Sequence, residues 1–211
     1  MSHGYFLEAS SKHTTHALVL GKVLKNQMVL DVGCNDGYLG SASDSSNTFY
    51  GLDQEEDAVI KAKKHYKDVI VYNLNELEKL PWGLKFDVII FADVLEHVVD
   101  PEKTLLFFVE NYLKEDGSVS ISLPNIAYWY TRLGLLFGNF DYTETGILDK
   151  THLHFYTAKS AKHFLSNVGL KSVEMKYGSI RFGWLCENVP LFGIVFGRLL
   201  AYNLVFYAKK Q

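Results

Sequence analysis

The chain has 211 residues, of which 48% are hydrophobic, and a formal net charge of −3 at pH 7. This length and composition suit one compact domain, so we expect a single domain over residues 1–211. Proteins that grip nucleic acid by its phosphates usually carry a basic surplus, and the mild negative charge predicts no nucleic-acid partner. The two cysteines, Cys34 and Cys186, form no CxxC pair, so neither a structural zinc site nor a disulfide framework is expected.

Two stretches bear on targeting and membrane contact. Residues 1–16 are polar with scattered aromatics, unlike a signal peptide, and we expect a cytoplasmic protein. Leu191–Ala208 is apolar over about the length of a membrane span, but Arg198 near its centre makes a lone spanning helix costly. We expect a buried helix followed by a strand there, and leave peripheral membrane contact open. The oligomeric state cannot be predicted from these features.

Helix and strand signals alternate along the chain, which is typical of a parallel α/β sheet. In chain order we expect a helix over 9–24, a strand over 28–32, a weak helix after Gly37, a strand over 48–52, a helix over 55–66 and a strand over 69–72. We then expect a strand over 86–92, a helix that starts at Pro101 with Asp100 as its cap, a strand over 118–123, a helix over 158–168, and strands over 171–177 and 202–208.

A glycine-containing loop, Asp31-Val-Gly-Cys-Asn-Asp-Gly37, follows the first predicted strand. Open α/β sheets bind ligands at the carboxyl ends of their strands. Gly33 permits a tight turn close to a ligand, and Gly37 lets the next helix begin near the strand. Asp53 ends the second strand, about 20 residues on, where an acid binds ribose hydroxyls in dinucleotide folds.

The same loop departs from two other nucleotide-binding patterns. Its glycines, Gly33, Gly37 and Gly40, do not have the G-x-G-x-x-G spacing of dehydrogenases, and no Gly-Lys-Ser/Thr motif occurs in the chain. Taken alone, the loop indicates either a nucleotide-like ligand or a purely structural turn.

Four segments, in the right order and spacing, resemble the class I S-adenosylmethionine-dependent methyltransferases. They are Val29-Leu-Asp-Val-Gly-Cys-Asn-Asp-Gly37, Tyr50-Gly-Leu-Asp53, the stretch from Phe86 to His97 with Asp100-Pro101 after it, and Leu113-Lys-Glu-Asp-Gly117. The resemblance implies S-adenosylmethionine as the cofactor. It also implies an α/β fold, Rossmann-like, with a seven-stranded and mostly parallel sheet and one antiparallel strand near its C-terminal edge.

The resemblance further implies a set of cofactor-binding positions. They are Asp31, Gly33, Cys34, Asn35, Gly37, Asp53, Gln54, Asn73, Leu74, Ala92, Asp93 and Val94. The loop positions would hold the ribose and the amino-acid part, with Asp53 on the ribose hydroxyls. Gln54 and the pair Asn73 and Leu74 would lie toward the adenine, and the last three positions toward the methionine end. Two positions depart from the family pattern, because Asn35 replaces a glycine and Asn73 replaces an acid.

Three histidines are candidates for a general base if the methyl acceptor is a hydroxyl. His97 follows Glu96 in the family-like segment. His152 and His154 alternate with apolar residues, which would put them on one face of a half-exposed strand together with Tyr156. We take His152 first and His97 second as candidate catalytic residues.

The surrounding segment, Gly138 to Thr157, resembles a stretch of bacterial methyltransferases linked to glycan or other small-molecule biosynthesis. In related O-methyltransferases a histidine here lies near the acceptor. The aromatic-rich residues at about 124–156 fit a cap over the acceptor, although aromatic core packing is an alternative. His152 and His154 could also bind a metal, but no third ligand at matching spacing is apparent, so no metal is predicted.

We therefore expect an S-adenosylmethionine-dependent methyltransferase that acts on a small molecule, with a hydroxyl of a metabolite or glycan precursor as the acceptor. Two alternatives stay open. One is a non-catalytic S-adenosylmethionine-binding regulator or partner subunit, and the other is a membrane-peripheral methyltransferase of a lipid or quinone. The sequence does not distinguish oxygen, nitrogen and carbon as the methylated atom.

Overall fold

The computed structural model describes residues 14–178 and 196–211. Its strands are β1 (Met28–Val32), β2 (Thr48–Asp53), β3 (Asp68–Val71), β4 (Phe86–Ala92), β5 (Leu113–Pro124), β6 (Leu170–Gly178) and β7 (Asn203–Lys210). Its helices are α1 (Thr15–Leu20), α2 (Tyr38–Ala42), α3 (Glu56–Ala62), α4 (Pro101–Tyr112), α5 (Trp129–Leu136) and α6 (Ala158–Asn167), with a short 3₁₀ helix, η1 (Leu95–His97).

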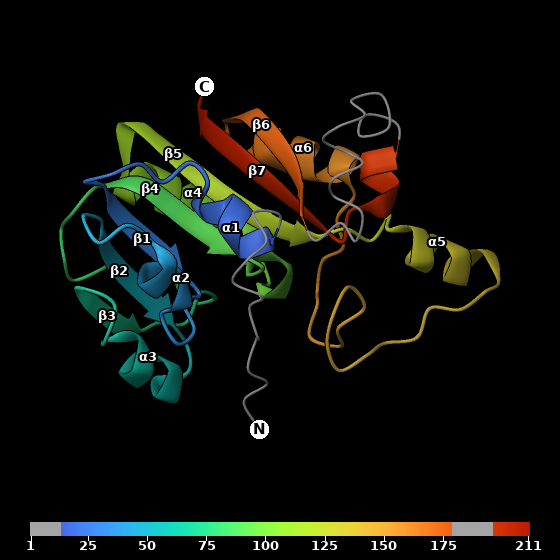
Figure 1. The fold of residues 1–211 in the computed structure, drawn as a ribbon, viewed down its shortest axis with the longest axis horizontal. Coiled ribbons are helices and arrows are strands. Elements are labelled where there is room, and N and C mark those ends of the chain that lie inside the picture. The colour runs from blue at the N-terminus through green and yellow to red at the C-terminus, as the bar shows by residue number, and fades with distance from the viewer. Residues whose placement is uncertain (1–13, 179–195) are drawn as a thin grey trace.

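The strands form one seven-stranded sheet in the order β3-β2-β1-β4-β5-β7-β6 (Figure 1). Only β7 runs against its neighbours, β5 and β6, within the described residues. The predicted mostly parallel sheet with one antiparallel strand near the C-terminal edge is confirmed. The strand order reverses between β1 and β4, and ligands bind at the carboxyl ends of the strands at such a switch point.

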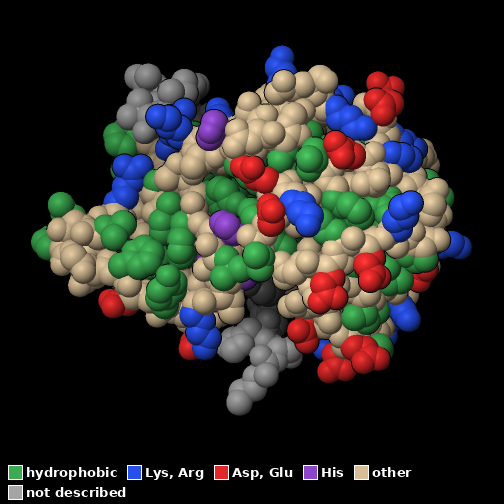
Figure 2. Space-filling model, turned by 180° about the vertical axis from the view of Figure 1, so that it is seen from behind, with side chains coloured by type: hydrophobic (Ala, Val, Ile, Leu, Met, Phe, Trp, Pro, Cys, Tyr) green, Lys and Arg blue, Asp and Glu red, His purple; other side chains and the backbone are tan. Residues whose placement is uncertain are grey.

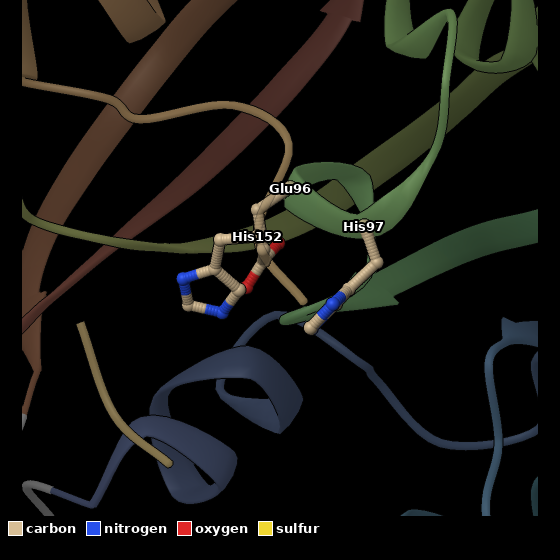
Figure 3. Close-up of side chains that lie close together, drawn as sticks. All are labelled: Glu96, His97 and His152. Atoms are coloured by element: carbon tan, nitrogen blue, oxygen red, sulfur yellow. The ribbon is translucent and has the colours of Figure 1, made fainter. Parts of the chain in front are cut away.

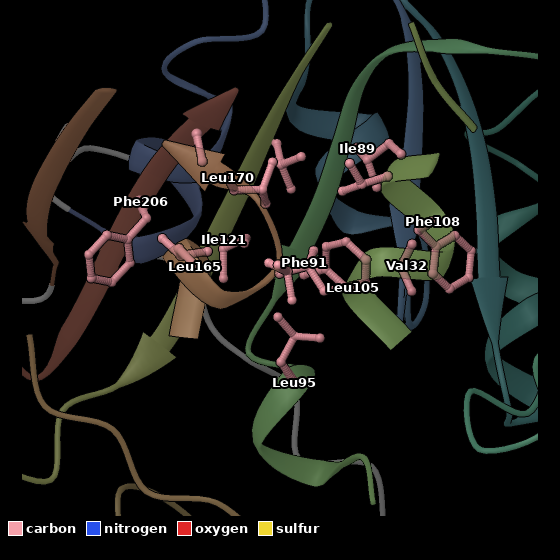
Figure 4. Close-up of a cluster of buried hydrophobic side chains, with 14 of the residues drawn as sticks. Val32, Ile89, Phe91, Leu95, Leu105, Phe108, Ile121, Leu165, Leu170 and Phe206 are labelled. Atoms are coloured by element: carbon pink, nitrogen blue, oxygen red, sulfur yellow. The ribbon is translucent and has the colours of Figure 1, made fainter. Parts of the chain in front are cut away.

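Helices cover both faces of the sheet. The larger core lies against α4 and α6 and includes Phe91, Phe108 and Leu165 (Figure 4). The smaller core on the opposite face includes Val19 of α1 and Val59 of α3. Strand β4 contributes to both cores, as expected of an uninterrupted apolar strand buried on two sides.

The ends of α4 and α6 lie where local sequence signals put them. Asp100 accepts a hydrogen bond from the Lys103 N–H at 3.0 Å, and Pro101 occupies the first helical position, where no N–H is needed. Thr157 and Ser160 cap α6 reciprocally. These caps confirm both predicted starts.

The first predicted helix, over residues 9–24, is too long. Thr14 has an extended backbone, and its side chain accepts a hydrogen bond from the Ala17 N–H, so α1 begins at Thr15. It ends at Leu20, and a turn follows in which the Val23 N–H donates to the Leu20 carbonyl. Residues 9–13 lie outside the described residues.

Two further boundaries differ from the predictions. The helix predicted over 55–66 ends at Ala62, and turns carry the chain on to Tyr66. The strand predicted over 118–123 begins at Leu113, directly after α4, and an irregular register against β4 accommodates the extra residues.

The C-terminal apolar stretch is partly described. Residues 196–200 are helical, and β7 is a buried strand of the sheet, in line with the predicted helix followed by a strand. Residues 191–195 and Cys186 lie outside the described residues. Across the described ranges, no helix has the length and apolar character needed to cross a membrane.

The segment predicted as a cap, residues 124–156, contains α5 and long irregular stretches that extend away from the sheet (Figure 1). Large apolar side chains are exposed along α5 and just after it, and Figure 2 shows hydrophobic side chains gathered on this part of the surface. They include Trp129, Tyr130, Leu133, Leu135, Leu136 and Phe137.

Candidate functional site

The loop after β1 is held by its own backbone hydrogen bonds. The N–H groups of Gly33 and Cys34 both donate to the Leu52 carbonyl, at 2.8 and 2.9 Å, and the Gly37 N–H donates to the Cys34 carbonyl at 3.0 Å. The Cys34 side chain is 4% exposed and belongs to the smaller core. These three N–H groups are therefore already bonded within the protein.

Two glycines in this loop are required by geometry. Gly33 has a φ of +77°, and a Cβ there would lie 2.4 Å from Cγ2 of Val94. Gly37 has a φ of +82°, and its Cβ would lie 2.8 Å from Cα of Ala62. Asn35, at a φ of 46°, takes the left-handed conformation expected of it. The loop therefore fits closely between β4 and α3.

We predict that Gly37→Ala destabilises the protein more than Gly138→Ala. Both residues have a left-handed backbone, with φ of +82° and +79°, but a Cβ at Gly138 would meet nothing within 4 Å. Left-handed strain costs about 1–2 kcal/mol in each variant, and overpacking against Ala62 adds about 1–3 kcal/mol to Gly37→Ala alone. Urea denaturation measures both losses. Equal losses would mean that the contact with α3 yields without strain.

Asp53 ends β2 beside this loop. Its Oδ2 accepts a hydrogen bond from the Asn35 N–H at 2.7 Å, and its Oδ1 accepts one from the Glu55 N–H at 3.0 Å. Each oxygen keeps a further lone pair, so the carboxylate can still accept hydrogen bonds from a diol. Gln54 is the next residue and is exposed.

Asn73 and Leu74 follow β3 at the same edge of the sheet. Tyr72, the first residue after β3, donates its N–H to the Asp53 carbonyl at 2.8 Å. This hydrogen bond holds the ends of β2 and β3 together. The Asn73 side chain is exposed and donates to Glu76 at 2.9 Å, whereas Leu74 packs against the larger core. The structure thus brings this pair toward Asp53. Its contact with adenine stays a prediction.

Asp31 lies beneath the loop and is only 1% exposed. The Tyr66 hydroxyl donates to its Oδ2 at 2.5 Å, and its Oδ1 has no hydrogen-bond partner within the described residues. Burial raises the pKa of Asp31 to about 7, although the Tyr66 hydrogen bond opposes that rise. Asp31 therefore faces the smaller core, and its predicted role in cofactor binding stays a prediction.

Ala92, Asp93 and Val94 lie at the end of β4. Oδ1 of Asp93 accepts hydrogen bonds from the Ser122 hydroxyl at 2.8 Å and from the Asn203 amide at 2.9 Å. Burial raises the pKa of Asp93, and the Ser122 hydrogen bond lowers it. Sequence reasoning missed these two partners, although each is a buried polar residue of a strand.

The two candidate catalytic histidines lie together, and Glu96 joins them. One donor atom from each of Glu96, His97 and His152 lies within 4.8 Å of the other two. Figure 3 shows the carboxylate between the two imidazole rings, whose centroids are 4.7 Å apart. Glu96 and His152 are buried, at 1% and 8% exposed. We call these three residues the histidine–glutamate cluster.

Hydrogen bonds fix both imidazole rings. Nδ1 of His152 lies 3.0 Å from the Ile147 carbonyl. Nδ1 of His97 lies 3.3 Å from the Thr151 carbonyl and 3.1 Å from its hydroxyl oxygen. The Thr151 hydroxyl in turn donates to Asp149 at 2.6 Å. Because carbonyl oxygens only accept, the geometry favours a proton on each Nδ1 and leaves each Nε2 as an acceptor.

The charge state of the cluster follows from burial. Burial, and the nearby charge of Asp93, raise the pKa of Glu96 well above its ordinary value. Burial also lowers the pKa of His97. Glu96 is a residue that the sequence reasoning did not select, even though it stands next to His97 in the family-like segment.

The predicted strand around His152 and His154 is not formed. The N–H groups of Leu153 and His154 both donate to the Glu96 carbonyl, at 2.8 and 3.2 Å, instead of pairing with a strand. His152 is buried, whereas Leu153 is 54% exposed. These backbone hydrogen bonds dock the segment onto η1. Glu96, from a distant part of the chain, thereby lies beside both histidines, which spacing along the sequence did not indicate.

His16 of α1 is a further residue that the sequence reasoning missed. Its ring lies 5.1 Å from that of Tyr38, the first residue of α2. Burial lowers its pKa, and Asp93 raises it. These contacts set α1 over the same end of the sheet as the loop and the end of β4.

Residues 6–175 match the family described as a methyltransferase domain. The chain belongs to this family. The match and the sheet topology together confirm the resemblance to class I S-adenosylmethionine-dependent methyltransferases.

Similar proteins agree with this family. The mitochondrial ubiquinone biosynthesis O-methyltransferase of Candida albicans is 32% identical over 116 residues, covering 50% of this chain and 35% of that protein. The ubiquinone biosynthesis O-methyltransferase of Glaesserella parasuis is 31% identical over 112 residues, covering 48% and 47%. This chain therefore aligns with half or less of the length of these relatives.

A solved structure extends the likeness of the fold. The S-adenosylmethionine-dependent methyltransferase from Mesorhizobium loti superimposes with a TM-score of 0.63 and 17% identity, covering 93% of this chain and 98% of that one. At this identity the superposition shows only that the two folds are similar. The chemistry of this chain has to be argued from the residues described above.

Proposed function

We propose that this protein transfers a methyl group from S-adenosylmethionine to a hydroxyl of a small molecule. The observation that carries the proposal is the histidine–glutamate cluster, in which Glu96 and His97 follow β4 next to the predicted cofactor positions and His152 lies against them. One buried and one exposed imidazole, close to the carboxyl end of β4 and to the switch point of the sheet, are suited to proton transfer from an acceptor. The names of the relatives, both O-methyltransferases, support oxygen as the methylated atom.

The residues at the loop fit the cofactor. Asp53 keeps lone pairs for the two ribose hydroxyls while backbone N–H groups hold it in place. Carbonyl oxygens of the loop suit the ammonium group of the amino-acid part, because the neighbouring N–H groups are already bonded. Because Gly33 has no Cβ, the loop lies close to Val94, and a Cβ at position 33 would fill the space between them.

The chain's own residues would handle the proton of the acceptor. When bound, the cofactor supplies a methyl group made electrophilic by its sulfonium. The acceptor oxygen forms a bond to that carbon while the carbon–sulfur bond breaks, and the hydroxyl proton leaves to a base. His152 is our first candidate for that base, because its Nδ1 faces the Ile147 carbonyl and its Nε2 can take a proton. His97 is the second.

The acceptor side is proposed to include residues 124–156 as a cap within the single domain over residues 1–211. Main-chain hydrogen bonds from Leu153 and His154 to Glu96 tie the end of this segment to the cluster. We propose a metabolite or glycan precursor as the acceptor, without a nucleic-acid partner, and a cytoplasmic location. The alternative of a non-catalytic cofactor-binding protein predicts binding without transfer to any acceptor.

A second candidate function is a membrane-peripheral methyltransferase of a quinone or lipid. The exposed apolar side chains on α5 favour it, as do the names of the relatives in ubiquinone biosynthesis. Co-sedimentation with lipid vesicles that depended on α5 would favour this function over action on a freely dissolved acceptor.

We predict that Asp53→Ala weakens S-adenosylmethionine binding about 10- to 100-fold, because it removes hydrogen bonds to a charged acceptor. Isothermal titration with S-adenosylmethionine and with its demethylated product measures the change. Asp57→Ala, an exposed acid in the first turn of α3, is the matched control and should bind like the wild type. Failure of the wild type to bind would overturn the proposed function, whereas unchanged affinity in Asp53→Ala would remove only the ribose role.

A further inference from the structure

The histidine–glutamate cluster contains a buried carboxylate with unmet hydrogen-bonding capacity. Glu96 is 1% exposed, and neither of its carboxylate oxygens has a hydrogen-bond partner within the described residues. Protonation would not resolve this, since a carboxylic acid also needs an acceptor for its proton. Buried polar groups without partners are rare and costly, so a group that completes the site is expected.

The two histidines present the right atoms to such a group. Each Nδ1 faces a carbonyl oxygen, that of Ile147 for His152 and that of Thr151 for His97. Histidines that bind metals usually donate their other ring N–H to a carbonyl or carboxylate in this way, which leaves Nε2 as the ligand. The contact from Thr151 to Asp149 extends the support of His97 by one more hydrogen bond.

We propose that Glu96, His97 and His152 bind one divalent transition-metal ion, with Zn²⁺ as the best-suited ion. Two imidazoles and one carboxylate are a ligand set of catalytic zinc sites, which leave a fourth position open. Tetrahedral ligands about 2.1 Å from zinc lie about 3.4 Å apart, so donors now within 4.8 Å need to close by about 1.4 Å. Metal binding would therefore draw the three side chains toward one another.

The surroundings favour a cation at this position. Asp93 and Asp149 both lie near enough to act electrostatically on Glu96, and no Lys or Arg among the described residues is a salt-bridge partner of Glu96. An ionised, buried carboxylate beside two other acids is electrostatically unfavourable. A bound divalent cation would make the ionised form of Glu96 favourable.

The ion would take part in the proposed methyl transfer by binding the acceptor, and this role rests on the proposed function. Its open position would take the acceptor's hydroxyl oxygen and lower the pKa of that hydroxyl, as zinc does for bound water. The proton then goes to solvent, the oxygen gains the methyl group, and the two histidines act as ligands instead of bases. The acceptor class is accordingly a hydroxyl compound that can reach a metal ion, such as a phenol.

Zinc binding by the full chain tests the site directly. Titration of the metal-free wild type with Zn²⁺ should give one tight site, and a rise in melting temperature on adding Zn²⁺. Glu96→Gln and His152→Ala should each weaken Zn²⁺ binding at least 100-fold and abolish that rise. His154→Ala, whose Nε2 lies 3.3 Å from the Val99 carbonyl outside the cluster, is the matched control and should bind like the wild type.

Two results would overturn the metal site: a wild type that takes up no Zn²⁺, or a Glu96→Gln variant that is folded and binds Zn²⁺ with wild-type affinity. If His152→Ala fails to fold, Glu96→Gln keeps the test intact because the amide preserves the shape of the side chain. Methyl transfer that persists at full rate after removal of metal by a chelator would refute the role of the ion in the reaction while leaving the proposed function standing. A protein that binds Zn²⁺ but never S-adenosylmethionine would refute the proposed function alone.

Discussion

His152→Ala is expected to lower the rate of methyl transfer about 10²- to 10⁴-fold, the usual effect of losing a positioned general base, and the same variant would lose a ligand of the proposed metal ion. The reason is local: His152 is buried beside Glu96 and His97, and its ring is oriented by the Ile147 carbonyl. The loss is expected in kcat more than in cofactor affinity, because the predicted cofactor positions lie on other segments.

Single-turnover kinetics with a panel of phenolic and sugar acceptors would measure the effect of His152→Ala. Cofactor affinity and melting temperature should be recorded for the same variant, so that a folding defect is recognised as such. His154→Ala belongs to the same segment but lies outside the cluster, and should retain wild-type rates. Equal rates for wild type and His152→Ala, with an acceptor turned over by both, would remove His152 from the chemistry.

The positions of the proposed cofactor-binding residues in the fold could be predicted from the sequence because their signals are local. The glycines after β1 and the acid at the end of β2 each follow a short apolar strand, and the sheet topology brings the strand ends together. The hydrogen bond between the Asn35 N–H and Asp53 is a direct consequence of that arrangement. The same local signals placed the starts of α4 and α6, where caps and a proline mark the position.

The acceptor side could not be predicted in the same way, because it depends on contacts between distant segments. Glu96 and His152 meet only because Leu153 and His154 bond to the Glu96 carbonyl. Alternation of polar and apolar residues suggested a strand there, but the N–H groups found a different acceptor. Neither spacing nor composition indicates such a contact, so the sequence does not predict that Glu96 lies beside the two histidines.

The overlong first helix has a related cause. Apolar residues continue past the end of α1, and Val23 packs against the smaller core from a turn instead of a helix. Hydrophobic periodicity reports which side chains are buried, and it does not by itself separate a helix from the turn that follows it. Backbone hydrogen bonds at Gly21 and Val23 decide where the helix stops.

Asp31→Asn is expected to make the protein more stable at pH 8 while leaving its stability at pH 3 nearly unchanged. Burial raises the pKa of Asp31 from 3.8 to about 7 in the folded protein. The folded state therefore holds this proton more tightly than the unfolded state does. Its stabilising contribution is complete below about pH 4 and is lost as pH rises through about 7.

A pKa difference of this size corresponds to about 4 kcal/mol at most between the two pH extremes. Asparagine keeps the shape of the side chain and still accepts the hydrogen bond from Tyr66, but it carries no charge into the core. Urea denaturation of the cofactor-free protein from pH 3 to pH 8 should show the wild type and Asp31→Asn diverging as pH rises.

Asp87→Asn is the opposite control for this experiment. The hydrogen bond and charge of Lys114, together with the Met28 N–H, hold the pKa of Asp87 below its ordinary value despite partial burial. Its contribution is present above the unfolded pKa and is lost as pH falls, so Asp87→Asn should reduce stability at neutral pH and not at pH 3. Parallel pH profiles for wild type and Asp31→Asn would mean that Asp31 is ionised in the folded protein at little cost, and that its buried position is compensated by groups other than Tyr66.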